Sequence, residues 1–579
     1  MATKNSIDLI INTGMPGVIK GRQPQPEFVK KLRAEGIKFE LKDFKAAEPG
    51  MTKGKKSGRL TMPPKKYLAE TNVHEAEMNP WDLAHITNRH IETSQSFVEP
   101  DAVNELIVED KIRGNFKGID AEILDKTDDS DNFDPDWNPH ENIVWHLDDT
   151  HSQLKSARDT VMNAEEIIRI GHLDTGYGKG HPQLPPNMNY TLQKNFIKGE
   201  DPKDASDRRT TGFLKMPGHG TGTSGVLAGG MYKNDGVGFN DFIGGAPFAE
   251  IIPCRIAPSV VLMKTSAFAE AIRYLVELTA AGTTVHVVSM SMGGVPSQAW
   301  ADAVNAAYEA GITIVTAAGN NFNGLPTRKL IYPSRFHRVI AACGVTHDYA
   351  PYYHKKLGEM QGNWGPQRFM DKALAAFTPN TLWPRMSTKT VSFSGAGTSA
   401  ATPQIAAAAA CYYKKYSKQL NALPEAWMRV EAIRNALYKS ALKLVKFADD
   451  GYEVYFGNGI LHAKDALAIP VPTAASLQQM KSKIDDVPFF PLLSILFKAQ
   501  QKPVDTNELQ MFNVELAQLV HNNIDLQKLL DDDEKTFGEL DVKERKLFMD
   551  AVISKKDASK TLKKFLQEYY NILSIAKLD

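Results

Sequence analysis

Between about residues 165 and 465 the chain alternates between short apolar runs and helical patterns. The apolar runs, which are rich in β-branched residues, are Ile167–Leu173, Ile251–Ile256, Val285–Met292, Ile312–Ala318 and Val339–Val345. The helical patterns between them are His219–Ala228, Thr265–Thr279, Ser297–Ala310 and the alanine-rich Ser399–Lys415. Strands that are apolar throughout are buried on both faces, as in a parallel sheet covered by helices on each side. The sequence therefore predicts an α/β fold whose ligands bind at the carboxyl ends of the strands.

The regions on either side of this α/β part have different patterns. Upstream, Ser6–Asn12 and Ile37–Leu41 indicate strands and Glu27–Glu35 indicates a helix, which together make an α+β region. Downstream, Glu508–Leu530 and Lys543–Leu578 have helical patterns with no strand signal, which predicts an all-helical appendage. The expected division is an N-terminal region over 1–105 with a Lys-, Gly- and Pro-rich linker at 46–66, an acidic linker over 106–142, the parallel-sheet domain over 143–470 and the helical part over 471–579.

Composition narrows the classes of function. The 68 Lys and Arg residues balance the 68 Asp and Glu residues, so no overall charge attracts nucleic acid or an anionic membrane. No stretch approaches the roughly 18 apolar residues of a membrane span, and the first residues lack the continuous apolar region of a signal peptide, so we expect a cytoplasmic protein. The cysteines, Cys254, Cys343 and Cys411, lie in apolar stretches and are expected to be buried thiols.

Three glycine-flanked segments carry an acid, a base and a nucleophile, in that order. They are Leu173-Asp174-Thr175-Gly176, Gly218-His219-Gly220-Thr221 and Gly397-Thr398-Ser399-Ala400-Ala401-Thr402-Pro403. A serine hydroxyl becomes a nucleophile at neutral pH when an imidazole takes its proton, and the imidazole needs a carboxylate to fix its tautomer. Asp174 follows a predicted strand directly, which puts it on the ligand-binding edge of the sheet. The segments predict a serine endopeptidase with Asp174, His219 and Ser399 as catalytic residues.

Three other chemistries that share these motifs fit the sequence less well. An aspartic protease needs two Asp-Thr-Gly carboxylates that share a proton, and this chain has one, at Asp174. A dinucleotide site over residues 220–225 would need a strand directly before its first glycine, where Met216-Pro217-Gly218-His219 makes a poor strand end. An α/β-hydrolase needs Gly-x-Ser-x-Gly and the order serine, acid, histidine, whereas Ala401 fills the last glycine position here and the order differs.

The three segments resemble the signature blocks of the subtilisin-like serine protease family, in that family's order. The resemblance extends to Ser291-Met292-Gly293-Gly294, Ala317-Ala318-Gly319-Asn320 and Phe456-Gly457-Asn458-Gly459, so that six blocks cover roughly residues 145–468. It implies that Asn320 donates its side-chain amide to the oxyanion beside the Ser399 backbone N–H. It also implies that Ser291, Met292, Gly293, Ala317, Ala318 and Gly319 bind the substrate backbone and wall the pocket for P1, the residue before the scissile bond. These small apolar walls favour a sizeable apolar or neutral P1 residue.

The sequence departs from the family pattern behind the nucleophile. Ala400 stands where methionine is usual, Gln404 where histidine is usual and Ala407 where glycine is common. We expect these residues to alter the packing of the pocket or of the helix without loss of the chemistry. His172 lies on an apolar strand and is expected to be packed rather than catalytic.

No cofactor is required by this chemistry, and no metal-binding residue is predicted. Family members often bind structural calcium, and the aspartates Asp128, Asp129, Asp131, Asp134 and Asp136 are candidate ligands. They lack the spaced loop pattern with a central glycine, so a solvated loop is favoured. His140 and His146 lie close by, without the ligand spacing of a zinc site.

The flanks point to control of the site. Family members commonly carry a propeptide that blocks the cleft until it is cleaved; residues 96–101 resemble the end of one, and Trp145-His146-Leu147 resembles the start of a mature catalytic domain. The resemblance makes residues 1–105 a candidate prodomain, processed within 120–142, with a permanent N-terminal domain as the alternative. The C-terminal helices have no family signature and could bind a protein partner, gate the cleft, form an oligomer or pack their own core. The expected substrate is a polypeptide, and the rival interpretation is a catalytically silent binding or regulatory protein that kept the fold.

Overall fold

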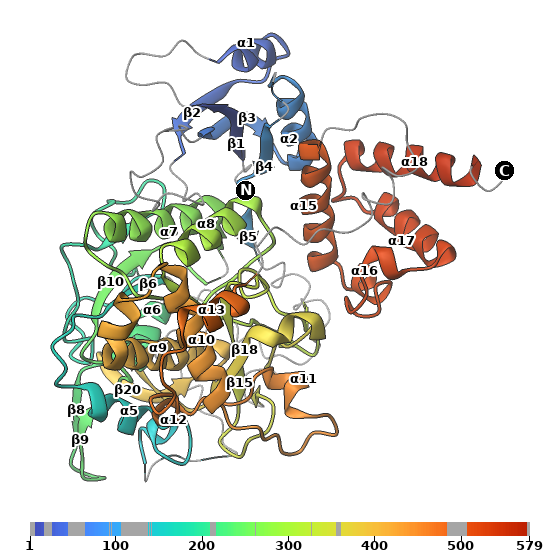
Figure 1. Ribbon diagram of the computed structural model, residues 1–579. Helices are drawn as coiled ribbons and strands as arrows, with labels where there is room; N and C mark the ends of the chain where they lie inside the picture. Colours follow the sequence, from blue (N-terminus) through green and yellow to red (C-terminus); the bar gives the residue numbers. More distant parts are fainter. Residues whose placement is uncertain are drawn as a thin grey trace.

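The computed structural model describes residues 6–16, 26–44, 64–91, 93, 95–105, 137, 139, 142–208, 216–260, 262–325, 327–354, 360–482 and 506–575 of the chain. Figure 1 shows a large α/β body, a smaller N-terminal unit of strands and helices above it, and C-terminal helices beside both.

A sheet of seven parallel strands forms the centre of the α/β body. In spatial order the strands are β18 (Ala373–Phe377), β15 (Val339–Val345), β13 (Thr313–Ala317), β12 (Val287–Met290), β6 (Arg169–Asp174), β10 (Glu250–Arg255) and β7 (Lys194–Asn195). Neighbouring strands all pair in parallel; Leu173, for example, lies opposite both Cys254 and Met290. The five apolar runs of the sequence are all strands of this sheet, which confirms the predicted α/β fold.

Helices cover both faces of this sheet. One face carries α7 (Thr265–Ala280) and α8 (Gln298–Glu309), and the other carries α5 (Leu154–Val161), α6 (His219–Ala228), α9 (Thr398–Asn421) and α10 (Trp427–Ser440). Adjacent residues of a strand point to opposite faces of the sheet: Val288 packs on the α7 and α8 side, and Val287 packs on the side of α5, α6, α9 and α10. The alanines of α9 at positions 406–410 are all buried, and their small side chains let that helix lie close to the sheet.

The N-terminal unit is an antiparallel sheet with two helices. The strand order is β2 (Phe39–Asp43), β3 (Pro64–His74), β1 (Ser6–Pro16) and β4 (Phe97–Pro100), and the helices are α1 (Glu27–Ala34) and α2 (Pro80–Arg89). The predicted strands and helix are confirmed. The predicted linker over 46–66 is wrong at its end, because residues 64–66 begin β3 and Lys66 pairs with Asn12 of β1. Local composition could not show that the Lys66 amine has a partner in Asp302 of α8, 2.9 Å away. Residues 46–63 lie outside the described chain.

Two acidic residues at the end of the N-terminal unit cap helices of the α/β body. Glu99 accepts hydrogen bonds from the backbone N–H groups of Gln298 and Ala299 in the first turn of α8, at 3.1 and 2.9 Å. Asp101 accepts one from the Ser266 N–H in the first turn of α7, at 2.8 Å. These N–H groups have no acceptor within their own helices, and the positive end of a helix dipole favours a carboxylate. The caps fix the N-terminal unit on the α7 and α8 face.

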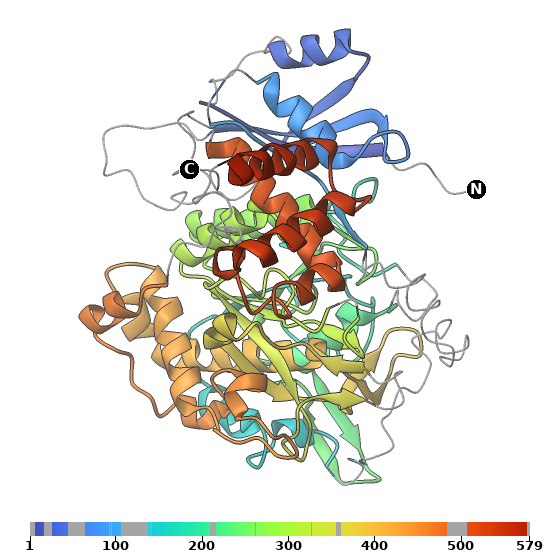
Figure 2. The same ribbon diagram turned by 90° about the vertical axis from the view of Figure 1, so that its right-hand side faces the viewer.

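The described residues of the C-terminal part form helices joined by turns, with no strand among them, as predicted. Its helices are α13 (Ala474–Met480), α15 (Thr506–Asn522), α16 (Ile524–Lys528), α17 (Val542–Ser554) and α18 (Lys560–Ile575). The long helix expected to end at Leu530 is interrupted because Asn523 is extended, with φ −128° and ψ 103°. Figure 2 shows α15 to α18 lying between the N-terminal unit and the α/β body, in contact with both.

Short elements complete the described structure. Two of them, β5 (Val103–Glu105) and β11 (Leu262–Lys264), pair antiparallel with each other. The other short strands are β8 (Met231–Asn234), β9 (Phe239–Phe242), β14 (Asn320–Phe322), β16 (Tyr353–His354), β17 (Met360–Gly362), β19 (Thr381–Arg385) and β20 (Thr390–Gly395). The short helices are α11 (Tyr452–Phe456) and α12 (Ala463–Ala466), and the 3-10 helices are η1 (Trp145–Leu147), η3 (Gln367–Lys372) and η4 (Phe537–Glu539).

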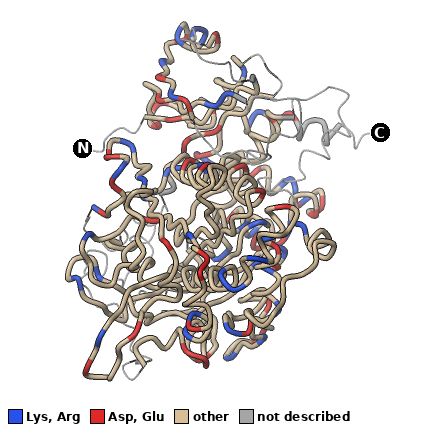
Figure 3. The backbone as a smooth tube through the Cα atoms, turned by 60° about the vertical axis from the view of Figure 1, so that its left-hand side comes forward, with Lys and Arg blue, Asp and Glu red and all other residues tan. Residues whose placement is uncertain are grey.

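The distribution of charged residues and the burial of the cysteines can be compared with the expectations from composition. Figure 3 shows basic and acidic residues intermixed along the chain. The three cysteines are buried and free, which confirms that prediction. Within the described residues, no helix is both long enough and apolar enough to cross a membrane.

Candidate active site

Asp174 ends β6, the strand at which the chain order of the sheet changes direction. Because β6 lies between β10 and β12, its carboxyl end opens into the crevice where open α/β sheets bind ligands. The Asp174 carboxylate is fully buried, and Oδ1 accepts hydrogen bonds from His219 Nδ1 and from the Thr175 N–H, both at 2.7 Å. Burial alone would raise the pKa of Asp174, but attraction to His219 and these hydrogen bonds outweigh it and hold the pKa below its usual value. Asp174 is therefore ionised.

His219 is the first residue of α6 and follows Gly218, whose φ of 76° turns the chain into the helix. Since Nδ1 faces Asp174, the other ring nitrogen, Nε2, points away from the carboxylate. Nε2 is buried and has no hydrogen-bond partner among the described residues. The close approach of α6 to the Asp174 turn requires glycine at position 220, because a Cβ there would lie 2.0 Å from the Gly176 carbonyl oxygen. The imidazole is thus a base with one open nitrogen.

Ser399 lies in the first turn of α9, which packs against α6. Its Oγ donates a hydrogen bond to the Ser291 carbonyl oxygen at 3.2 Å, and the Ser291 hydroxyl donates one to the Ser399 carbonyl oxygen at 3.0 Å. Within the described chain, the Ser399 hydroxyl therefore makes no hydrogen bond to His219. Rotation about χ1 redirects this hydroxyl, and hydrogen bonds between catalytic groups often form fully only with substrate bound.

Asn320 follows β13 and lies beside the start of α9. Its Oδ1 accepts a hydrogen bond from the Thr398 backbone N–H at 3.0 Å. Because a backbone N–H can only donate, this contact fixes the amide with Nδ2 on the other side. Gly397, with a φ of 74°, leaves room there, since a Cβ on it would stand 2.9 Å from Nδ2. Asn320 Nδ2 and the Ser399 N–H, which has no acceptor within its helix, are two donors at one helix start.

The two segments predicted to bind substrate leave the sheet side by side. Residues 291–293 follow β12, and residues 317–319 end or follow β13, its parallel neighbour. Both segments reach the start of α9: the first through Ser291 and Ser399, and the second through the Gly319 N–H, which donates to Thr398 Oγ1 at 3.2 Å. The space between them therefore borders the Ser399 side chain.

Comparison with known proteins identifies the family of this chain. A family model described as the subtilase family matches residues 166–459, just over half of the chain. This chain belongs to the subtilase family. It is 24% identical to subtilisin DY of Bacillus licheniformis over 302 residues, which cover 52% of this chain and 90% of that protein. It is 26% identical to subtilisin Savinase of Lederbergia lenta over 300 residues, with 52% and 90% covered, and 24% identical to subtilisin E of Bacillus subtilis (strain 168) over 300 residues, with 52% and 65% covered. By its family, this chain is a serine peptidase, a class of enzyme whose substrates are polypeptides.

Asp207 connects the turn after Asp174 with the turn before His219. The sequence alone did not single out this residue. Its Oδ2 accepts hydrogen bonds from Thr175 Oγ1 at 2.8 Å and from the Gly218 N–H at 3.1 Å. Its Oδ1 pairs with Arg255 Nη1 at 3.3 Å, and the same guanidinium donates to the Thr175 carbonyl oxygen. The available signal was Arg255 itself, a charged residue that ends an apolar strand and needs a buried partner.

Thr223 is a second supporting residue of the subtilase that the motifs did not single out. Its hydroxyl donates to Asp174 Oδ2 at 3.0 Å and lies 2.8 Å from His172 Nε2. Since the threonine proton goes to the carboxylate, His172 Nε2–H is the donor in the second contact. Burial lowers the pKa of His172 and keeps it neutral, so this packed histidine orients the threonine rather than competing for the carboxylate.

The departures from the family pattern are accommodated in α9. Gln404 Nε2 donates to the Phe377 carbonyl oxygen at 2.7 Å and to the Ala400 carbonyl oxygen at 2.8 Å, which ties the helix to β18. Ala407 lies close to Gly245, where a Cβ would come 2.8 Å from the alanine methyl carbon. These contacts show how Gln404 and Ala407 pack in this chain; that they alter the pocket or the helix packing relative to the family stays a prediction.

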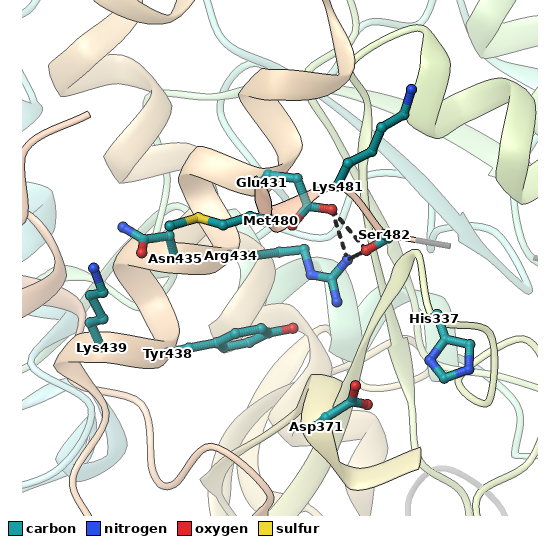
Figure 4. Close-up of a pocket in the computed structure, with 10 residues that line it drawn as sticks. All are labelled: His337, Asp371, Glu431, Arg434, Asn435, Tyr438, Lys439, Met480, Lys481 and Ser482. Carbon is teal, nitrogen blue, oxygen red and sulfur yellow. Dashed lines mark hydrogen bonds and ion pairs between the residues drawn. The ribbon is translucent and has the colours of Figure 1, made fainter. Parts of the chain in front are cut away.

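A cavity of 420 Å³ lies between α10, η3 and residues 480–482 (Figure 4), and none of the candidate active-site residues lines it. Its lining residues are His337, Asp371, Glu431, Arg434, Asn435, Tyr438, Lys439, Met480, Lys481 and Ser482. Glu431 Oε1 accepts from Arg434 Nη1 at 3.2 Å and from Ser482 Oγ at 2.8 Å, so its carboxylate is already paired. Among the described residues no group of three or more His, Cys, Asp or Glu could hold a metal ion, and Asp128 to Asp136 lie outside them.

Proposed function

We propose that the protein is a serine endopeptidase that cleaves polypeptides through an acyl-enzyme on Ser399. The observation that carries this proposal is the ionised, buried Asp174 bonded to His219 Nδ1, with Nε2 left open on a helix that packs against the Ser399 helix. Nε2 is thereby available to take the proton of a serine hydroxyl, which is what a general base requires.

The proposed reaction begins when the Ser399 hydroxyl rotates away from Ser291. Oγ attacks the scissile carbonyl carbon and its proton passes to His219 Nε2, while Asp174 stabilises the imidazolium. Asn320 Nδ2 and the Ser399 N–H donate to the oxyanion. Collapse of the tetrahedral species expels the amine, which takes the proton from His219. Water then attacks the ester by the same steps in reverse and restores Ser399.

The flanks supply the proposed regulation. The N-terminal unit caps α7 and α8 through Asp101 and Glu99, and β5 adds a strand to β11 directly after those caps. This docking supports a role for residues 1–105 as an inhibitory prodomain. The predicted processing segment, 120–142, lies outside the described residues except for 137, 139 and 142. The C-terminal helices contact both the N-terminal unit and the α/β body, which supports a part in the same control.

The rival function is a silent binding protein of protease fold. It is favoured by one observation: the Ser399 hydroxyl is engaged by Ser291, and the residue is only 8% exposed. The two functions differ in whether Ser399 reacts.

Labelling with a fluorophosphonate probe separates them. We expect the purified chain, before or after trimming of its N-terminal region by limited proteolysis, to form an adduct on Ser399 that mass spectrometry locates. The Ser399→Ala chain, treated identically, provides the control. Absence of an adduct on Ser399 under all trimming conditions would refute the peptidase and favour the binding protein.

A further inference from the structure

Residues Leu330 to Tyr332 cross the gap between the two segments that border Ser399. The Ile331 N–H donates to the Ala318 carbonyl oxygen at 3.0 Å, which attaches this stretch to one segment. Tyr332 exchanges two backbone hydrogen bonds with Gly294, of 3.0 and 2.8 Å, which attaches it to the other. Ile331 therefore stands at the base of the gap.

The side chain of Ile331 occupies the space that the glycines leave open. A Cβ built on Gly293 would lie 2.5 Å from Ile331 Cδ1, and one built on Gly319 would lie 3.0 Å from Ile331 Cγ2. Its branched end thus touches both glycine faces at once, and the residue is 7% exposed. A side chain that enters between Gly293 and Gly319 meets these methyl groups.

Contacts from α16 and the turn that follows it hold this stretch in place. Thr327 Oγ1 donates to Gln527 at 3.1 Å, and Lys329 Nζ pairs with Glu534 at 2.8 Å. On the other side of Ile331, Arg335 pairs with Asp533 at 2.8 Å, and both side chains are almost fully buried. Anchors on both sides limit how far Ile331 can retreat from a bulky group.

We propose that Ile331 is the specificity-determining residue of this site and restricts P1 to glycine, alanine or serine. The inference rests on the proposed function, because the acyl group on Ser399 directs its side chain into the bordering gap. This inference differs from the sequence-based prediction of a sizeable P1 residue, which considered only the small, apolar walls. The walls are small, but Ile331 fills the space between them. Space that is already filled by packed atoms cannot admit a ring without displacing them.

The test compares peptides that differ only at P1, alanine against phenylalanine, cleaved by the active enzyme. For the wild type we expect kcat/KM to favour alanine by about 100-fold, and Ile331→Gly to reverse that preference. Ile331→Ala serves as a second variant that retains a Cβ and should bring the two substrates closer together. Ile314→Ala, which truncates a buried isoleucine on the α7 and α8 side of the sheet, is the matched control and should keep the wild-type ratio.

The outcomes separate this inference from the proposed function. A wild-type enzyme that carries the fluorophosphonate label and prefers phenylalanine overturns the role of Ile331 alone. So does an unchanged ratio in both Ile331 variants, provided that they are labelled. A wild type that takes no label under any trimming condition overturns the proposed function, and this inference with it.

Discussion

Thr223 shows how single residues around Asp174 act on the base without touching substrate. Asp174 Oδ1 is engaged by His219, so the direction of the carboxylate depends on what holds Oδ2. Thr223 supplies that hydrogen bond, and His172 orients the threonine from behind. Thr223 is therefore a positioning residue of the proposed reaction.

Replacement of Thr223 tests this role. Thr223→Val removes the donor to Asp174 Oδ2 and leaves His172 Nε2–H without its acceptor, so we expect kcat to fall about tenfold, in line with about 1–1.5 kcal/mol for one hydrogen bond. Because the residue does not contact substrate, KM should change little. Thr223→Ser, which keeps the hydroxyl, should restore kcat, and steady-state kinetics on one peptide measure all three enzymes. A loss of the same size in the serine variant would indicate a packing role instead.

At the scale of elements, the helix starts do most of the positioning. α6 carries His219 at its first residue, and α9 presents the Ser399 N–H in its first turn, so both reactive groups lie where a helix begins. The starts of α7 and α8 are used differently: they receive the carboxylates of Asp101 and Glu99 from the N-terminal unit. Free N–H groups at a helix start thus supply one donor of the proposed oxyanion site at α9 and dock the N-terminal unit at α7 and α8.

Glu99 makes the stability of this docking depend on pH. Burial raises the pKa of Glu99 to about 7, although the hydrogen bonds from Ala299, Gln298 and Ser297 favour its carboxylate. A carboxyl whose pKa is higher in the folded state binds protons more tightly when folded. Its contribution is therefore complete below about pH 4.5 and disappears as pH rises through about 7, a change on the order of 3 kcal/mol.

We expect Glu99→Gln to flatten this dependence. In the Ser399→Ala background, which prevents self-cleavage, the thermal midpoint of the parent should fall from pH 5 to pH 8 by more than that of the glutamine variant. Differential scanning fluorimetry at several pH values gives both curves. Parallel curves would show that Glu99 does not titrate in this range.

At the scale of the whole molecule, the C-terminal helices join the two other parts. Gln518 of α15 accepts a hydrogen bond from Trp81 Nε1 of the N-terminal unit at 2.9 Å and donates one to the Pro296 carbonyl oxygen of the α/β body at 2.8 Å. Asp82 caps the start of α18 by accepting from the Lys560 and Thr561 N–H groups, at 3.0 and 3.1 Å. We infer that these helices act as a clasp that retains the N-terminal unit on the α/β body.

Loss of the Gln518 bridge should loosen the N-terminal unit. In Gln518→Ala the Trp81 indole N–H and the Pro296 carbonyl lose their partner, which costs about 1–3 kcal/mol and raises local opening roughly fivefold or more. Amide hydrogen exchange of α2 and β4 in the uncleaved Ser399→Ala chain measures this opening. Glu508→Ala is the matched control on the same helix, because its contact with Arg89 is long, 3.8 Å, and exposed, and such pairs contribute little. Equal exchange in the two variants would contradict the clasp.

The sequence by itself determined the parts of this protein whose signals are local. A strand buried on both faces is apolar along its whole length, so Val339–Val345 could be located to the residue. The bounds of His219–Ala228 were also correct, although this helix is buried on every side and has no amphipathic pattern. Glycine-flanked motifs likewise marked Asp174, His219 and Ser399 as candidates, and the resemblance to the family added Asn320.

Tertiary structure decided what depends on residues distant in the chain. Ile331 lies between Gly293 and Gly319 only because β12 and β13 are neighbours and a later stretch folds back across them. Asp207, Thr223 and the Gln518 clasp depend in the same way on partners that no local pattern encodes. The physical reason is that periodicity reports which face of an element is buried, whereas the packing of separate elements decides which side chains meet there.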